Sequence, residues 1–212
     1  MGSERTAELL QGALALQPRP EGGASLYRAY CADCHGAQAW GDPLAVVPAL
    51  AGQRELYLLK QLVDFAELDR AAPEMHRLMA RAQLGTPQGW RDLAAYLAGQ
   101  TGNERAEHGD GTALVQGERL YREACAACHG RNGAGSDLAA VPDLRSQHYS
   151  YLVLQLRSID TGHRYNVAED VYEALIGLSA ADMRSVADYL SRIPGRAAVS
   201  GHQISMSGAY DP

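Results

Sequence analysis

Two short motifs place thiol and imidazole groups next to one another. All four cysteines of the chain lie in them, and each motif ends in a histidine: Cys31-Ala-Asp-Cys34-His35 and Cys125-Ala-Ala-Cys128-His129. In a C-x-x-C-H motif the thiols add to the vinyl groups of haem, and the imidazole lies beneath the iron as its proximal ligand. We therefore predict two covalently bound haem c groups, with His35 and His129 as iron ligands.

Other uses of a C-x-x-C pair fit the chain less well. Cysteine and histidine donors could build one tetrahedral zinc cluster, but here each motif is complete by itself. A thioredoxin-like redox pair is expected near a βαβ pattern, whereas these motifs end short helical stretches at 24–34 and 118–128. Covalent attachment also suits small domains, because the tethered haem supplies much of the core.

The two motifs belong to an internal repeat. Positions 31 and 125 lie 94 residues apart, and many identical residues recur at that spacing. They are Tyr27 and Tyr121, Pro48 and Pro142, Gln53 and Gln147, Tyr57 and Tyr151, Gln61 and Gln155, and Arg70 and Arg164. A constant spacing over some fifty residues indicates duplication of a whole folding unit.

The repeat divides the chain into two similar domains. We place them at 24–99 and 117–194, with an N-terminal extension at 1–23, a Gly-rich linker at 100–116 and a tail at 195–212. Apolar residues in both units recur at helical spacing, and Gly- and Pro-containing stretches separate them. The predicted fold class is all-α, with two tandem domains.

Composition narrows the function. The formal net charge is −6 and lysines and arginines are not clustered, so nucleic acid is not expected as a partner. No stretch approaches the roughly 20 apolar residues of a membrane span, and no export signal is visible in 1–17, so we treat the chain as a mature form. No acid–base pair or nucleophile is recognisable, which favours an electron carrier over an enzyme.

Longer stretches of the repeat carry a family resemblance. The first half reads CADCHG, PALAGQRELYLLKQLVDF and DLAAYL, and the second reads CAACHGRNGAG, PDLRSQHYSYLVLQL and VADYL. This pattern resembles the dihaem cytochrome c4 family over nearly all of 24–194. The resemblance implies two class I cytochrome c domains packed haem edge to haem edge.

The same resemblance implies a periplasmic carrier that exchanges electrons with redox partner proteins, namely a donor and a terminal oxidase, reductase or dehydrogenase. It also implies that the backbone carbonyls of Pro48 and Pro142 accept hydrogen bonds from the proximal histidines.

A carrier of this class needs a sixth iron ligand, commonly a Met thioether, which raises the reduction potential. In the first half Met75 follows Pro73-Glu74, the position that the family pattern assigns to the ligand, and we favour it over Met79. Either methionine could instead fill the core.

The second half has no methionine at that position. The spacing of 94 residues carries Met75 to Glu169 and Met79 to Glu173, and alignment on Leu178-Ser179 places Val171 there instead. None of these is the expected ligand, so the second haem departs from the family pattern.

Several residues could replace the missing methionine. They are His163, Met183, His148, Tyr149, His202 and Met206. His163 is our candidate, because it lies in the loop expected to cross the distal face, although a loop histidine is usually solvated. Without a substitute the iron is five-coordinate or water-bound, which would suit catalysis or binding of a small ligand. An electron-accepting subunit of a larger oxidoreductase is a further alternative.

Overall fold

The computed structural model describes residues 4–81 and 84–195. Its regular elements are helices: α1 (Glu4–Leu14), α2 (Pro20–Tyr30), α3 (Ala32–His35), α4 (Glu55–Ala66), α5 (Pro73–Met79), α6 (Pro87–Ala98), α7 (Leu114–Ala124), α8 (Ala126–His129), α9 (Tyr149–Asp160), α10 (Glu169–Leu175) and α11 (Ala180–Ser191). Over these ranges the only β pairing is two isolated bridges. The predicted all-α class is confirmed.

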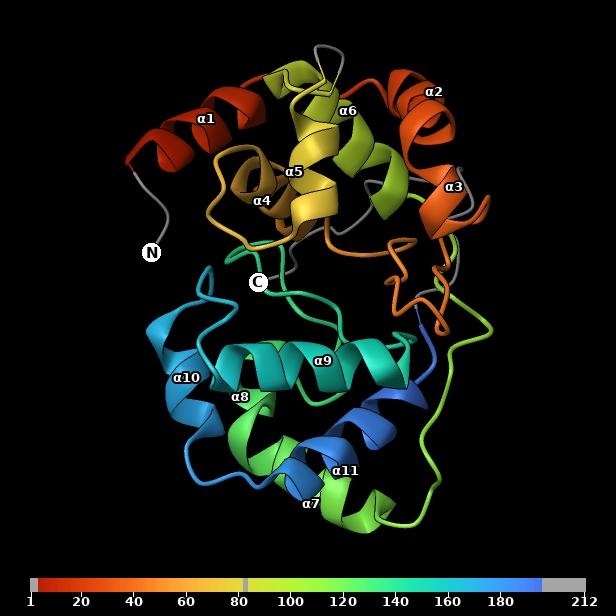
Figure 1. Ribbon diagram of the computed structural model, residues 1–212, viewed down its shortest axis with the longest axis vertical. Coiled ribbons are helices and arrows are strands. Elements are labelled where there is room, and N and C mark those ends of the chain that lie inside the picture. The colour runs from red at the N-terminus through yellow and green to blue at the C-terminus, as the bar shows by residue number, and fades with distance from the viewer. Residues whose placement is uncertain (1–3, 82–83, 196–212) are drawn as a thin grey trace, which may run out of the picture.

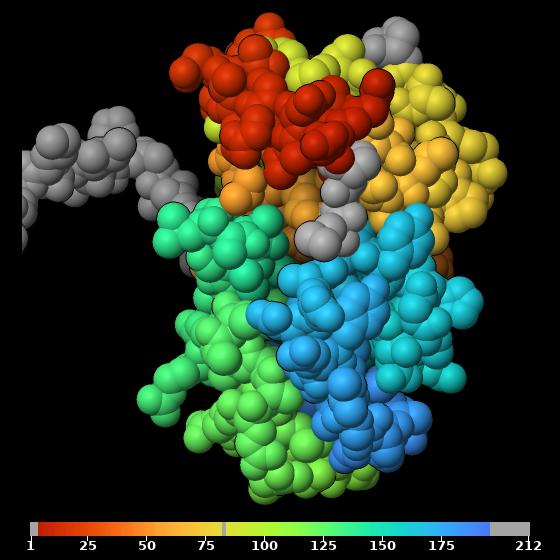
Figure 2. Space-filling view, turned by 90° about the vertical axis from the view of Figure 1, so that its left-hand side faces the viewer, coloured from red at the N-terminus to blue at the C-terminus, as the bar shows by residue number. Residues whose placement is uncertain are grey.

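The helices form two bodies, α1–α6 and α7–α11, one above the other in Figure 1. Figure 2 shows that their surfaces meet directly. Each body has its own apolar core. The first helix of each repeat begins a little before the predicted domain start, since α2 begins at Pro20 and α7 at Leu114.

The first and last helices of each repeat cross at a glycine. A Cβ atom on Gly23 of α2 would lie 2.0 Å from the carbonyl oxygen of Asp92 on α6. In the second domain, a Cβ atom on Gly117 of α7 would lie 2.0 Å from the carbonyl oxygen of Ser185 on α11. Only glycine permits this backbone approach, so both helix pairs that support the motifs depend on a small residue.

Local signals define where the last helix of each domain begins. Thr86 accepts a hydrogen bond from the backbone of Gly89, and Pro87 occupies the first turn of α6. At α11, Ser179 and Asp182 form a reciprocal capping box. Both arrangements satisfy amide groups that have no partner within the helix.

The N-terminal extension adds a helix to the first domain alone. α1 packs on α4 and α6, with Ala13 fully buried. Its first turn is held by Arg5, which forms an ion pair with Glu67, and by Thr6, whose hydroxyl donates to Asp69. Residues 4–14 are therefore part of the first domain's packing.

Candidate haem-binding sites

Both C-x-x-C-H motifs lie at a break between two helices. Cys31 separates α2 from α3, and Cys125 separates α7 from α8. The second cysteine of each motif, Cys34 or Cys128, is exposed, and all four thiols are free. The motif therefore presents two thiols three residues apart on one short turn, as attachment to the edge of a flat ring requires.

The environment of the first cysteine in each motif keeps it unreactive. Burial raises the pKa of Cys31 to about 11 and that of Cys125 also to about 11. A thiol that stays protonated at neutral pH is a poor nucleophile.

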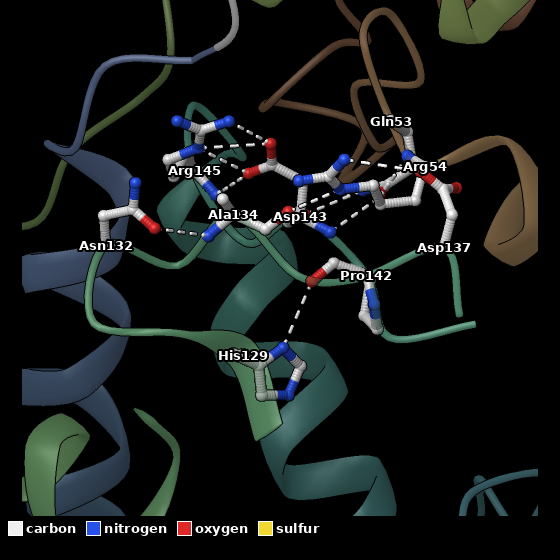
Figure 3. A network of polar contacts seen from close by, with 9 residues as sticks. All are labelled: Gln53, Arg54, His129, Asn132, Ala134, Asp137, Pro142, Asp143 and Arg145. Atoms are coloured by element: carbon white, nitrogen blue, oxygen red, sulfur yellow. Dashed lines mark hydrogen bonds and ion pairs between the residues drawn. The ribbon is translucent and has the colours of Figure 1, made fainter. Parts of the chain in front are cut away.

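Each histidine of the motifs is oriented by a backbone carbonyl. His35 Nδ1 lies 3.0 Å from the carbonyl oxygen of Pro48, and His129 Nδ1 lies 3.1 Å from that of Pro142; Figure 3 shows the second pair. A ring that donates through Nδ1 leaves Nε2 as a lone-pair donor for a metal. Burial lowers the pKa of both imidazoles, which favours the neutral ring that ligation needs.

The loop that carries the proline is folded back by a glycine in each domain. Gly41 has a φ of +79°, and a Cβ atom there would lie 2.3 Å from the carbonyl oxygen of Val47. Gly135 has a φ of +63°, and its Cβ atom would lie 2.3 Å from the carbonyl oxygen of Pro142. Both features exclude other side chains, so these glycines help to bring the proline carbonyl to the histidine.

The donor set fits haem c better than a bare metal ion. No group of three or more His, Cys, Asp or Glu side chains in 4–81 and 84–195 converges on a point that could hold a metal. Two thiols for the ring edge and one imidazole with a free Nε2 match the needs of a covalently attached porphyrin instead. The first domain also contains two buried atoms without a partner among the described residues, Asp64 Oδ1 and Trp90 Nε1. Polar atoms of this kind are rare in a complete core.

α5 and α10 follow Arg70 and Arg164, which are equivalent in the repeat, and each of the two helices has seven residues. His76 Nε2 lies 2.6 Å from the carbonyl oxygen of Arg70. The hydroxyl of Tyr172 donates to the carbonyl oxygen of Arg164, the repeat equivalent of Arg70, at 3.0 Å. His76 and Tyr172 thus hold equivalent carbonyls and are themselves structurally equivalent.

This equivalence defines the register of the two helices. The residue before His76 is Met75, and the residue before Tyr172 is Val171. Both are half-buried. Of the two alignments considered from sequence, the structure supports the one that places Val171, not Glu169, at the position of Met75.

The second methionine of α5 has a hydrocarbon counterpart. Met79 closes α5 and Leu175 closes α10, and each is 4 % exposed. A leucine therefore fills, in the second domain, the position that Met79 has in the first. Met75, at the edge of the first domain's core, is the freer of the two.

The other residues proposed as iron ligands of the second haem lie outside α10. His163 is exposed, with Nδ1 2.8 Å from the hydroxyl of Thr161. Met183 is buried within α11. His148 and Tyr149 lie at the start of α9. His202 and Met206 lie outside the described residues.

Between the domains, two glutamines make reciprocal backbone contacts. The side-chain amide of Gln53 donates to the carbonyl of Asp143 and accepts from its amide, both at 2.7 Å. Gln147, the repeat equivalent of Gln53, makes the same pair of bonds to Ala49, both at 2.9 Å. Figure 3 shows that the Gln53 contact lies next to Pro142, above His129. Each domain thus holds the loop that orients the other domain's histidine.

The residues that follow these two glutamines also make equivalent contacts across the domain interface. Arg54 Nε donates to the carbonyl of Ala134 at 2.6 Å. Its equivalent, His148, has Nε2 2.7 Å from the carbonyl of Trp40. The two acceptors are themselves 94 residues apart. Different side chains therefore preserve the same contact.

A second part of the interface contains two arginines. Arg70 donates to the hydroxyl of Tyr151 at 2.8 Å, and Arg164 donates to the hydroxyl of Tyr57 at 3.1 Å. Both guanidinium groups also bond Gln155. Arg70 is buried, its side-chain hydrogen bonds go to the neutral oxygens of Gln61, Tyr151 and Gln155, and its guanidinium lies over the ring of Phe65.

The sequence alone identifies these interface residues only as positions that recur in the repeat. Their role was missed because a repeat shows which residues recur but not which surface they occupy. The available signal was that polar residues with hydrogen-bonding side chains, Gln53, Tyr57, Arg70 and their equivalents, recur unchanged in two otherwise divergent halves.

Two helical domains, each with thiols on a short turn and an oriented imidazole, define a dihaem c-type cytochrome. The sequence model of the cytochrome c family matches residues 20–101 and again 114–194. The chain belongs to the cytochrome c family and, within it, to the dihaem cytochromes c4. It carries two covalently bound haem c groups, as predicted.

Individual relatives cover most of the chain. A cytochrome c4 of Stutzerimonas stutzeri is 34 % identical over 76 % of this chain and 83 % of the relative. A thiosulfate dehydrogenase electron acceptor of Stutzerimonas stutzeri strain A1501 is 33 % identical over 82 % of this chain and 83 % of the relative. The crystal structure of reduced cytochrome c4 from Pseudomonas stutzeri superposes with a TM-score of 0.74 at 30 % identity, over 84 % of this chain and all of that one.

No helix within 4–81 or 84–195 is both long and apolar enough to cross a membrane.

Proposed function

We propose that this dihaem electron-transfer protein contains two unequal haems. The first is ligated by His35 and Met75, and the second by His129 without a methionine from its own domain. The observation that supports this inequality is the register of α5 and α10, in which Val171 takes the place of Met75. A thioether ligand raises the potential of a haem, so the first haem is the better electron acceptor.

The chain's own residues would keep the two haems in a constant relation. Gln53 and Gln147 tie the two proximal loops to the opposite domains, and the Arg70–Tyr151 and Arg164–Tyr57 bonds tie the other part of the interface. A fixed arrangement lowers the structural change that accompanies electron exchange. The proposed sequence is reduction by a partner protein, internal exchange, and delivery to an acceptor.

The proposed location is the periplasm, where cytochromes c4 act, and the proposed partners are soluble or membrane-bound redox proteins. The relative named as a thiosulfate dehydrogenase electron acceptor makes an electron-accepting role beside a sulfur-oxidising dehydrogenase the second candidate. The contacts described above suit both roles equally.

The ligand assignment is tested by absorption spectroscopy of the oxidised holoprotein. A methionine–iron charge-transfer band should be present at the intensity of one haem per chain. Met75→Ala should abolish this band and lower the potential of one haem, whereas Met79→Leu, the matched packing variant, should retain the band. A band of two-haem intensity, or its loss in Met79→Leu alone, would refute the assignment.

The electron-transfer role is tested separately. Stopped-flow mixing of the oxidised protein with a small reductant, and then with an oxidised small cytochrome, should show both haems reduced and reoxidised reversibly. A protein whose haems cannot be reoxidised by another cytochrome would not be a carrier.

A further inference from the structure

At the positions of α10 that correspond to Met75 and Met79 of α5, the second domain has hydrocarbon side chains. Val171 is half-buried where the first domain has Met75, and Leu175 is buried where it has Met79. The hydroxyl of Tyr172, the residue after Val171, is bonded to the carbonyl of Arg164. α10 therefore offers neither an iron ligand nor a free hydrogen-bond donor at this position.

Two of the three histidines of the second domain, His129 and His148, are already engaged by other contacts. His129 is the proximal residue. His148 is engaged at both ring nitrogens, since Nδ1 accepts from the backbone of Glu107 at 3.1 Å and Nε2 lies 2.7 Å from the carbonyl of Trp40. His163 lies at an exposed turn, paired with Thr161.

Two further donor types are equally unavailable. Met183, the only methionine between positions 114 and 194, is 2 % exposed and lies in α11, where Trp90 is its counterpart in α6. The only lysine of the whole chain, Lys60, belongs to the first domain and forms an ion pair with Asp64. Neither a methionine nor a lysine in the described part of the second domain is therefore placed as a spare ligand.

From these contacts we infer that the second haem keeps an exchangeable coordination position. This position takes a small, neutral, π-accepting diatomic ligand such as carbon monoxide or nitric oxide. This inference rests on the proposed unequal ligation. The apolar character of Val171 and Leu175 favours such ligands, because binding of an anion would require hydrogen-bond donors or a positive charge in the pocket. The first haem then exchanges electrons with a ligand-binding neighbour.

The test is titration of the dithionite-reduced holoprotein with carbon monoxide, read from the Soret difference spectrum. The wild type should bind one carbon monoxide for every two haems. Val171→Met should abolish binding and double the methionine–iron band of the oxidised protein. Val171→Leu, a substitution of similar bulk without sulfur, should leave the stoichiometry unchanged.

A complementary variant covers the case in which Val171→Met does not fold. Met75→Ala should raise the stoichiometry from one carbon monoxide to two per chain. Absence of binding to the wild type would overturn the inference, as would an unchanged stoichiometry in a folded Val171→Met protein.

One further outcome identifies a ligand from outside the described residues. If carbon monoxide binds only after the double substitution His202→Ala and Met206→Ala, the C-terminal segment supplies the ligand and the inference is wrong. Failure of the electron-transfer proposal is seen independently, in the reversible reduction assay and in the band of one-haem intensity, neither of which involves carbon monoxide.

Discussion

The reciprocal glutamine contacts predict a large loss of stability on removal of one side chain. In Gln147→Ala, both the amide and the carbonyl of Ala49 lose their partner. Gln147 is 7 % exposed and Ala49 8 % exposed, so water cannot readily replace the bonds. A lost hydrogen bond costs about 1 kcal/mol net, and a buried backbone group left without a partner costs about 1–3 kcal/mol.

Two such groups give an expected loss of about 2–5 kcal/mol in the free energy of unfolding. The measurement is guanidinium unfolding of the holoprotein followed by far-ultraviolet circular dichroism. Gln38→Ala, which truncates an exposed glutamine in the same domain as Ala49, is the matched control and should change stability by less than about 0.5 kcal/mol. Since Ala49 follows Pro48, the variant should also shift the potential of the first haem more than that of the second.

A Gln147→Ala protein as stable as the Gln38→Ala control would show that the domains do not depend on these bonds. The double variant Gln53→Ala, Gln147→Ala adds a further check. If the two contacts hold one interface, the second substitution should cost less than the first, because a loosened interface lets water reach the remaining backbone groups.

Two other substitutions test the packing that supports the motifs. Gly117→Ala places a Cβ atom 2.0 Å from the carbonyl of Ser185, and should destabilise the holoprotein by about 1–3 kcal/mol or more in the same unfolding assay. Gly12→Ala, in an open position of α1, should be neutral or stabilising by up to about 1 kcal/mol. Ser179→Ala removes the capping box with Asp182 and should cost about 1 kcal/mol, measurable as a lower thermal midpoint; no change would exclude a role for the cap.

Features governed by short stretches of chain could be predicted from the sequence. The C-x-x-C-H spacing is local, so the placement of thiols and imidazole on one turn follows from consecutive residues. The helices follow from apolar periodicity. The carbonyl of Pro48 beside His35 came instead from the family resemblance, because it depends on a loop that folds back at Gly41.

The interface could not be predicted in the same way. Whether Gln53 contacts Asp143 depends on how two domains pack, and no periodicity in either domain encodes that. Once the packing is known, the repeat explains part of it: equivalent residues meet across a pseudo-twofold axis, so several contacts occur twice. Arg54 and His148 illustrate this, since a guanidinium and an imidazole make the same bond to carbonyls 94 residues apart.

The position of the missing methionine required the structure. Between Arg164 and Tyr172 the second domain has two residues more than the first domain has between Arg70 and His76. Because a later segment is correspondingly shorter, Leu178 returns to the spacing of 94 residues from Leu84. A constant spacing therefore points to Glu169, and only the shared carbonyl contact identifies Val171.

The positions at which the two domains differ indicate which part of the second haem site has changed. The contacts that orient the two histidines and join the two domains are preserved in pairs, even where the side chains differ. The clear loss of a chemical group lies on α10, where a hydrocarbon replaces the thioether of α5. If the second haem had lost its function, the proximal contacts of His129 and the interface of its domain would be expected to degrade as well. Their preservation beside an altered distal helix argues for a second haem that still exchanges electrons but also binds an exchangeable ligand.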